Sequence, residues 1–352
     1  MTEWMELLKK AVADQASDVF FVAGKAPCEK VDGHIRPMSE DRLMPADTEQ
    51  IISQIYEATG RSMEQYVNRG DDDFSFSIPT LARFRVNTYR QRGSLAAVIR
   101  IVSFDIPDWR AIHIPEAVMN LADVQSGMVL VTGTAGSGKT TTQACIIDRI
   151  NRTRDCHIVT LEDPIEFLHR HQKSIVSQRE IAIDTQGYLA ALRACVRQAP
   201  DVILLGEMRD PQTIQTAISA AETGHTVIAT LHTRGAVNAI DRIIDAFPSN
   251  QQAQIRIQLA SVLRTVVSQQ LLPDCHGGMV PACEILQLNS AVRSMIRDNK
   301  NHQIDNVIAS GGKEGMCSMD RAIAALYHDG KISRETALEY ADRPEQLERL
   351  LG

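Results

Sequence analysis

The sequence has no pair of cysteines at the C-x-x-C spacing, although it contains seven cysteines. They are odd in number and scattered along the chain, which argues against both a disulfide framework and a zinc ribbon. Unpaired thiols of this kind are typical of proteins that work in a reducing compartment. The cysteine pattern therefore predicts a cytoplasmic protein with free thiols.

Two further features are missing, a long apolar run and an excess of positive charge. No apolar run approaches the length needed to cross a bilayer, and the first ten residues lack the apolar core of a signal peptide. The formal net charge of −7 argues against a main partner with a phosphate backbone, because such proteins usually carry a net basic domain. We therefore expect no direct membrane insertion and no nucleic-acid partner.

What the chain does contain is enough apolar sequence for more than one folded domain. Its 352 residues exceed the length of an average domain, so two or three domains are predicted. A hydrophobic fraction of 44% with 23% charged residues is ordinary for a globular protein and excludes extended disorder.

The most specific motif is a glycine-rich loop between an apolar strand and a helix. Residues 128–132 are apolar, residues 141–151 have a helical pattern, and the loop between them matches G-x-x-x-x-G-K-[ST]. In such a loop backbone N–H groups surround phosphates, Lys139 reaches the β- and γ-phosphates, and the Thr140 hydroxyl ligates Mg²⁺. The candidate ATP-binding residues are Gly133, Thr134, Ala135, Gly136, Ser137, Gly138, Lys139, Thr140 and Thr141.

The first part of the chain, residues 1–105, has the pattern of a small α+β domain. A helix capped by Thr2 is expected to bury Trp4 and Leu8, and a second helix is expected over 47–58. Strands are expected over 17–22, 30–36, 73–78, 81–87 and 94–102. Their alternation of apolar and polar residues favours an antiparallel sheet. A proline-containing linker is expected to follow at 106–115.

Residues 116–272 have the pattern of an α/β domain with a mostly parallel sheet. Near-continuous apolar strands are expected over 128–132, 157–161, 202–205 and 226–231, with helices between them. This alternation is typical of a parallel sheet covered on both faces.

Two helices of this domain have clear signals. One is expected to begin at Asp210 and Pro211 and to end before Gly224. The other is expected to carry five apolar residues on one face, namely Ile255, Leu259, Val262, Leu263 and Val266. The remainder, 273–352, is expected to form a helical region in which segments near 290–298, 318–328 and 334–341 pack as a small bundle.

Acidic side chains follow two of the predicted strands. The strand 157–161 runs into Glu162, Asp163 and Glu166, and the next apolar strand is followed by Glu207. Ligands bind at the carboxyl ends of strands in open α/β sheets. One of the first three carboxylates is expected to orient or deprotonate the attacking water, with a solvated acidic turn as the alternative. Glu207 is expected to act on Mg²⁺ through its water shell, or on the nucleophilic water.

Two histidines, His225 and His232, flank the strand 226–231. A single histidine is most often an ordinary core or surface side chain. Two histidines at corresponding strand ends instead favour a role in sensing the γ-phosphate, so both are candidate catalytic residues.

Together these motifs resemble the PilT family of type IV pilus retraction ATPases, within the type II/IV secretion ATPases. The resemblance extends over nearly the whole chain. The matching stretches are 17–18, 82–87, the phosphate loop, 161–167 (the Asp box), 206–210 (Walker B), and 221–225 with 230–233 (the His box).

The resemblance implies a PAS-like N-terminal domain, a RecA-like P-loop domain and a C-terminal helical region. It also implies a homohexamer. ATP and Mg²⁺ would bind between the N-terminal and P-loop domains and against a neighbouring subunit. It implies that Glu166 is the catalytic base, Glu207 the Walker B glutamate and His232 the phosphate-contacting histidine. Arg85 and Arg100 match the arginine fingers of the family, which is a role worth on the order of 10³–10⁵ in rate. Ordinary surface or inter-strand ion pairs are the alternative for both arginines.

Three features favour retraction over pilus assembly. Residues 291–298 resemble the family's Ala-Ile-Arg-Asn-Leu-Ile-Arg-Glu element, the N-terminus is short, and the tetracysteine motif of many assembly ATPases is absent. The resemblance therefore implies a motor for twitching motility. It would lie peripherally at the inner face of the cytoplasmic membrane and act through an inner-membrane platform protein.

Several alternatives stay open. The loop Arg197-Gln-Ala-Pro200 departs from the Arg-Glu-Asp-Pro of the nearest relatives and favours an accessory paralogue of the PilU type, which would work beside a paralogous retraction ATPase. An assembly or secretion ATPase of the same superfamily and a scaffold subunit with little activity are the other readings. A nucleic-acid translocase is disfavoured by the acidic balance.

Overall fold

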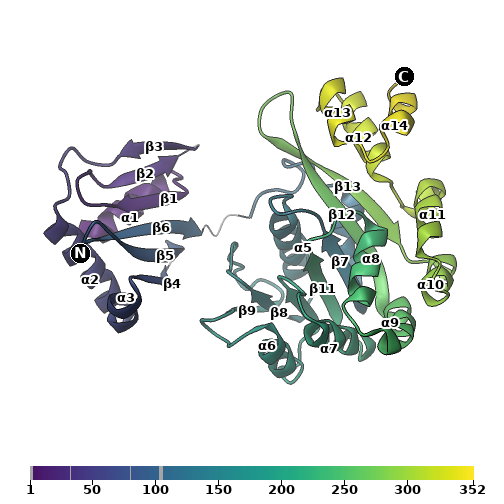
Figure 1. The fold of residues 1–352 in the computed structure, drawn as a ribbon, viewed down its shortest axis with the longest axis horizontal. Coiled ribbons are helices and arrows are strands. Elements are labelled where there is room, and N and C mark those ends of the chain that lie inside the picture. Colours follow the sequence, from purple (N-terminus) through teal and green to yellow (C-terminus); the bar gives the residue numbers. More distant parts are fainter. Residues whose placement is uncertain (1–2, 32, 80, 103–105) are drawn as a thin grey trace. The chain divides into compact units, whose positions relative to one another are not determined.

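The computed structural model describes residues 3–31, 33–79, 81–102 and 106–352 (Figure 1). The chain divides into two compact units. The first comprises residues 1–105 together with 166–168, and the second comprises 106–165 together with 169–352. The domain and linker limits expected from the sequence stay predictions.

The first unit contains a six-stranded antiparallel sheet in the order β3-β2-β1-β6-β5-β4. Its strands are β1 (Asp18–Phe21), β2 (Cys28–Val31), β3 (His34–Pro37), β4 (Asp71–Ile78), β5 (Ala82–Gln91) and β6 (Ser94–Val102). The single strand expected over 30–36 is two strands, because the chain turns at Gly33, whose φ of 80° carries no steric penalty in glycine. The expected antiparallel sheet is confirmed.

Three helices accompany this sheet, α1 (Glu3–Ala13), α2 (Pro45–Thr59) and α3 (Glu64–Arg69). Trp4 of α1 and both Ile52 and Ile55 of α2 are buried in one core with Phe84 of the sheet. This confirms the apolar faces that the sequence predicted for the first two helices. Thr2, the expected cap of α1, lies outside the described residues.

The second unit is built on a seven-stranded sheet in the order β13-β12-β7-β11-β10-β8-β9. Its strands are β7 (Gly127–Thr132), β8 (His157–Glu162), β9 (Ile175–Glu180), β10 (Val202–Leu205), β11 (Thr226–Leu231), β12 (Leu263–Pro273) and β13 (Met279–Gln287). Neighbouring strands are parallel, except that β13 runs antiparallel to β12. Every residue of β7, β10 and β11 is buried, which confirms the expected parallel sheet with two covered faces.

Helices cover both faces of this sheet (Figure 1). The short α4 (Glu116–Met119) and α5 (Lys139–Thr153) pack on one face. The other face is covered by α6 (Tyr188–Cys195), α7 (Pro211–Glu222), α8 (Ala236–Asp245) and α9 (Ser249–Val262). Helix α7 begins as predicted, because the Asp210 carboxylate accepts a hydrogen bond from the backbone N–H of Thr213 at 2.8 Å.

One predicted helix is wrong in its last part. The apolar spacing placed Leu263 and Val266 on the same helix face as Ile255, but α9 ends at Val262 and both residues belong to β12. β12 lies between β7 and β13 and is buried along most of its length. Its apolar residues therefore do not alternate, and periodicity cannot separate such a strand from a buried helix.

The region after residue 272 begins with a strand rather than a helix. β13 extends the sheet to Gln287, and the helices that follow are α10 (Ser290–Arg297), α11 (Ile304–Ser310), α12 (Met319–His328), α13 (Arg334–Tyr340) and α14 (Pro344–Leu351). They do not form one bundle. Val292 of α10 joins the core that contains α9, whereas α12, α13 and α14 surround Ile323 and Leu347 on the β12–β13 hairpin.

Candidate active site

The phosphate loop occupies residues 133–138, between β7 and α5. Gly133, Gly136 and Gly138 all have positive φ. A Cβ at Gly133 would collide with the carbonyl oxygen of Gln269, and one at Gly138 would lie 2.8 Å from its Nε2. Close packing therefore requires glycine at both positions, in addition to the backbone conformation. The N–H groups of the loop and of the first turn of α5 form the positive end of a helix, which is an anion site.

Lys139 is the first residue of α5 and is only 7% exposed. Its Nζ donates hydrogen bonds to the carbonyl oxygens of Gly133 at 2.9 Å and Thr134 at 2.7 Å. The ammonium group is thus held within the curve of the loop. The outer part of the loop, residues 134–136, is exposed. This places the one buried positive charge of the loop where phosphate oxygens would need it.

Sequence reasoning missed Gln269 of β12, which ties the loop to the sheet. Its side chain is 2% exposed. Its Nε2 donates to the backbone carbonyl of Ser137 at 2.7 Å, and its Oε1 accepts from Oγ1 of Thr142 at 2.7 Å. Ser137 and Gln269 are 132 positions apart, so no local signal in the sequence could have joined them.

The strands that carry the other predicted residues end at the same edge of the sheet as the phosphate loop. β7 and β11 pair in parallel, with Thr132 opposite Leu231. β11, β10 and β8 are also parallel neighbours, with Leu205 opposite both Ala229 and Leu161. The residues that follow β8, β10 and β11 therefore leave the sheet at the same edge as the loop that follows β7.

Glu207 and His232 lie together at this edge. Oε1 of Glu207 is 3.5 Å from Nε2 of His232, and its Oε2 is 2.7 Å from Nη2 of Arg209. The N–H groups on either side of Glu207 donate to carbonyl oxygens of β8 and β11, which fixes the backbone that carries it. The hydrogen bond that Arg209 donates to the Glu207 carboxylate raises the pKa of the Arg209 guanidinium. The structure thus joins two residues named from the sequence and adds Arg209.

The three carboxylates after β8 differ in their surroundings. Glu162 is buried and accepts hydrogen bonds from Oγ1 of Thr160 at 2.5 Å and Nε2 of Gln178 at 3.1 Å, so it holds neighbouring strands together. Asp163 and Glu166 are exposed. Glu166 belongs to the short segment that groups with the first unit. Its role as the catalytic base stays a prediction.

The pairing of the two histidines needs correction. His225 precedes β11 and His232 follows it, so within one chain the two lie at opposite ends of the strand. Nδ1 of His225 lies 2.8 Å from the carbonyl oxygen of Ala220 and 3.1 Å from Oγ1 of Thr223, at the C-terminal end of α7. His225 therefore stabilises a helix end, and His232 alone lies beside Glu207.

Arg85 and Arg100 lie directly opposite each other on β5 and β6 of the first unit. Each forms an ion pair across strands. Arg85 binds Asp73 through two nitrogens at 2.7 and 3.2 Å, and Arg100 binds Asp18 at 3.0 Å. Their side chains are 37% and 66% exposed. The inter-strand pairs expected as the alternative are present. Arg85 reaches toward β4 and Arg100 toward β1, and both side chains stay accessible on one face of the sheet.

Two predictions about the whole chain can be compared with the structure. All seven cysteines are free thiols, as expected, and four of them are buried. Within the described ranges of the chain, no helix has both the length and the apolar composition of a membrane span.

Known proteins resemble this chain over nearly its whole length. A family model described as type II/IV secretion system protein matches residues 2–333. The chain is 41% identical over 346 residues to the type IV pilus retraction ATPase PilT of Pseudomonas aeruginosa, an alignment that covers 97% of this chain and 99% of that protein. It is 34% identical over 350 residues to the type IV pilus ATPase PilU of the same organism, covering 99% and 91% of the two chains.

A solved structure is similar as well. The crystal structure of the pilus retraction motor PilT with bound ADP matches with a TM-score of 0.90 at 42% identity, covering 99% of this chain and 100% of that one. The match supports the expected architecture of an N-terminal domain, a RecA-like ATPase domain and a helical C-terminal region. The chain therefore belongs to the type II/IV secretion system proteins and, within them, to the PilT family.

Proposed function

We propose that this chain is a motor that hydrolyses ATP to power retraction of type IV pili. The observation that carries the proposal is the position of the Lys139 loop and the Glu207–His232 pair at one edge of one parallel sheet. The higher identity to the retraction ATPase PilT than to PilU supports retraction as the specific task.

The chain's own residues supply binding and positioning for the reaction. The N–H groups of the phosphate loop and the Lys139 ammonium bind the β- and γ-phosphates. Glu207 orients the water that attacks the γ-phosphate in line with the departing ADP. His232, which faces Glu207, contacts the γ-phosphate. The predicted base Glu166 would accept the proton of that water.

Mg²⁺ fits the donor groups at this edge. The Thr140 hydroxyl would bind the ion directly, and the Glu207 carboxylate would bind it through water, both with the oxygen ligands that Mg²⁺ prefers. Bound with the nucleotide, the ion would neutralise phosphate charge. In the part of the chain that the structure describes, no group of three or more His, Cys, Asp or Glu side chains forms a protein-only metal site.

Assembly as a homohexamer is part of the proposal. Arg85 and Arg100 present accessible cations from two neighbouring strands, and such cations can stabilise the charge on a phosphoryl group bound to a neighbouring subunit. Domain movement after hydrolysis would be transmitted to an inner-membrane platform protein, with the ring held peripherally at the inner face of the cytoplasmic membrane.

The element 291–298 is the proposed contact for that coupling, and its two arginines differ. Arg293 donates from Nη1 to the carbonyl of Ser261 at 3.1 Å and from Nη2 to that of Leu263 at 3.0 Å, so it supports the end of α9. Arg297 is exposed. Because Arg297 is exposed, an Arg297→Ala substitution should leave the fold intact. Wild-type pilus retraction by this variant would rule out a coupling role for Arg297.

The decisive experiment measures steady-state ATPase activity across protein concentrations, with oligomer size recorded by light scattering. Lys139→Ala and Glu207→Ala are expected to abolish turnover while circular dichroism stays unchanged. Wild-type turnover in both variants would overturn the proposal.

The same experiment tests the accessory PilU-like reading, which the loop 197–200 favours. A folded hexamer with negligible turnover of its own would support that reading. In cells, loss of a retraction motor leaves excess pili that do not retract, whereas loss of an assembly ATPase removes them.

A further inference from the structure

We propose that Gln269 is a positioning residue for ATP hydrolysis, because it sets the shape of the phosphate loop. The inference rests on the proposed function. Gln269 lies on β12, outside every nucleotide motif of the sequence. β12 is the direct neighbour of β7, the strand that leads into the loop.

The Gln269 side chain joins the two parts of the loop that must keep a fixed distance. Its amide nitrogen holds the carbonyl of Ser137 inside the loop, and its amide oxygen holds the hydroxyl of Thr142 in the first turns of α5. Both bonds are buried. A buried glutamine with both ends satisfied is a rigid spacer, because breaking either bond leaves an unpaired polar group away from water.

The bond to Ser137 also decides where a neighbouring N–H group points. In a trans peptide the C=O and N–H groups point in opposite directions. Anchoring the Ser137 carbonyl on β12 therefore directs the N–H of Gly138 away from β12. Phosphate loops bind anions with N–H groups of this kind, so we infer that Gln269 prepares a phosphate donor without contacting the nucleotide.

The loop packs against Gln269 so closely that its shape follows this residue. Neither Gly133 nor Gly138 has room for a Cβ beside it. A side chain at either glycine would therefore push the loop away from β12 and strain its contact with Gln269.

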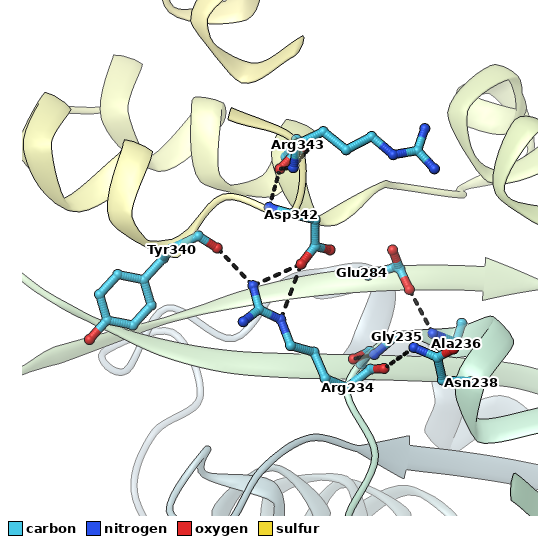
Figure 2. Close-up of polar contacts among 10 residues, drawn as sticks. Arg234, Gly235, Ala236, Asn238, Glu284, Tyr340, Asp342 and Arg343 are labelled. Carbon is cyan, nitrogen blue, oxygen red and sulfur yellow. Dashed lines mark hydrogen bonds and ion pairs between the residues drawn. The ribbon is translucent and has the colours of Figure 1, made fainter. Parts of the chain in front are cut away.

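The other face of the same hairpin fixes the second nucleotide-facing segment. Ser268 accepts a hydrogen bond from the N–H of Gly235 at 2.9 Å, and Glu284, its cross-strand partner, accepts from the N–H of Ala236 at 2.7 Å. These N–H groups begin helix α8, just after His232. Figure 2 shows Glu284 beside Ala236 and also the ion pair of Arg234 with Asp342, which lies between α13 and α14. One hairpin thus holds both the phosphate loop and the segment after His232. Gln269 is the hairpin residue that binds the phosphate loop.

Four variants test the proposal. Gln269→Leu removes both bonds, Gln269→Glu keeps the acceptor for Thr142 but loses the donor to Ser137, and Thr142→Val removes only the bond to Oε1. Gln287→Leu is the control, because Gln287 accepts a partly buried hydrogen bond from Thr265 in the same hairpin at 2.7 Å, at the end away from the loop.

The experiment measures ADP affinity by competition with a fluorescent nucleotide, together with kcat, KM and the melting temperature without nucleotide. Gln269→Leu is expected to weaken ADP binding about 10-fold to 100-fold, the range for an unsatisfied buried pair, and to raise KM more than it lowers kcat. Gln269→Glu is expected to lose at least as much, because its carboxylate repels the phosphates. Adding Thr142→Val to Gln269→Leu is expected to change affinity less than twofold, since the two side chains share one bond.

Distinct outcomes overturn the two proposals. ADP binding within twofold of wild type in Gln269→Leu, or an equal loss in Gln287→Leu, would show that Gln269 is only structural. If Gln269→Leu does not fold, an unaltered ADP affinity in the milder Thr142→Val variant would overturn the positioning role. Wild-type turnover in Lys139→Ala would instead overturn the proposed function itself.

Discussion

The two sheets of this chain make different parts of their strands available for function. In the second unit both faces are covered, so β7, β10 and β11 are buried throughout and polar groups collect at the strand ends. In the first unit the residues of β5 alternate, with Phe84 and Val86 buried and Arg85 and Asn87 reaching the surface. A buried parallel sheet therefore confines chemistry to one edge. An antiparallel sheet with one open face can present a charge from the middle of a strand.

The largest effect on ATP turnover is expected from a substitution on the open face of the first unit's sheet. Arg85→Ala should lower ATP turnover about 10³-fold, equivalent to about 4 kcal/mol in the transition state. Its unfolding free energy should change by less than about 1 kcal/mol, because the pair with Asp73 is exposed. Turnover and urea denaturation measure the two quantities. Arg90→Ala, an exposed arginine on the same strand, is the control; turnover that falls equally in both variants would contradict a specific role for Arg85.

The reverse pattern is expected in the middle of the covered sheet. Ile203 lies on the interior strand β10, between β11 and β8, and is fully buried, so Ile203→Ala should cost about 2–5 kcal/mol of unfolding free energy. Asn87 lies on the interior strand β5 of the other sheet and is exposed, so Asn87→Ala should stay within about 0.5 kcal/mol.

The two tryptophans make that comparison measurable, because Trp4 lies in the first unit and Trp109 in the second. Fluorescence in a Trp4→Phe background reports on the second unit alone. An equal cost for Ile203→Ala and Asn87→Ala would mean that the covered and open sheets do not differ as described.

The same contrast recurs between two adjacent residues of β4. Asp72 is buried and accepts hydrogen bonds from Arg61 at 2.8 and 2.9 Å and from Tyr56 at 2.9 Å, whereas Asp73 pairs with Arg85 at the surface. Burial raises the pKa of Asp72, but the hydrogen bonds from Arg61 and Tyr56 outweigh it, so its pKa lies below the ordinary value. Asp72→Asn should cost about 3 kcal/mol at pH 7, and Asp73→Asn about 0–1 kcal/mol.

The sign of the pH dependence follows from the direction of that shift. Because the folded pKa of Asp72 is lowered, its stabilisation is present at neutral pH and is lost as pH falls through the folded value. The stability difference between wild type and Asp72→Asn should therefore stay constant down to about pH 4 and shrink below it. Urea denaturation between pH 7 and pH 3 measures this, and a difference that shrinks already between pH 7 and pH 5 would contradict it.

The smallest effect is expected in a loop outside both sheets. Ala199 is exposed and has a φ of 50°. Asn tolerates this left-handed conformation better than Ala. Ala199→Asn should therefore stabilise the second unit by about 0.5 kcal/mol, and Gln198→Asn in the same exposed loop serves as the control. A melting temperature that falls in Ala199→Asn would disprove the backbone argument.

The two sheets also differ in how far the sequence could predict them. β7, β10, β11 and the residues at their ends follow local patterns, so the phosphate loop, Glu207 and His232 were predicted and lie at one edge. The hairpin β12–β13 was missed, because a strand buried on both sides has no alternation to detect. Gln269 depends on strand order, which links positions far apart in the chain and leaves no local signal.

The expectation that His225 and His232 lie at corresponding strand ends was wrong for a simpler reason. His225 and His232 flank one six-residue strand, whose ends lie about 20 Å apart. The two side chains therefore belong to opposite edges of the sheet, and strand geometry alone would have separated them. The roles of Glu166, Arg85 and Arg100 came from family resemblance, since exposed charges on a surface carry no pattern that identifies a partner.

Successive side chains of β12 point to opposite faces of the sheet, and this limits where the chain can gain or lose residues. Ser268 and Gln269 face opposite sides of the sheet only because they are consecutive, and inserting or deleting one residue before them would exchange the two faces. The stem from Leu263 to Gln269 therefore has a fixed number of residues. The turn at 274–278 contains two glycines with positive φ and is mostly exposed, so it can gain or lose residues with little effect on either loop. Insertions that arise in this hairpin are thus tolerated at its tip and rejected in its stem.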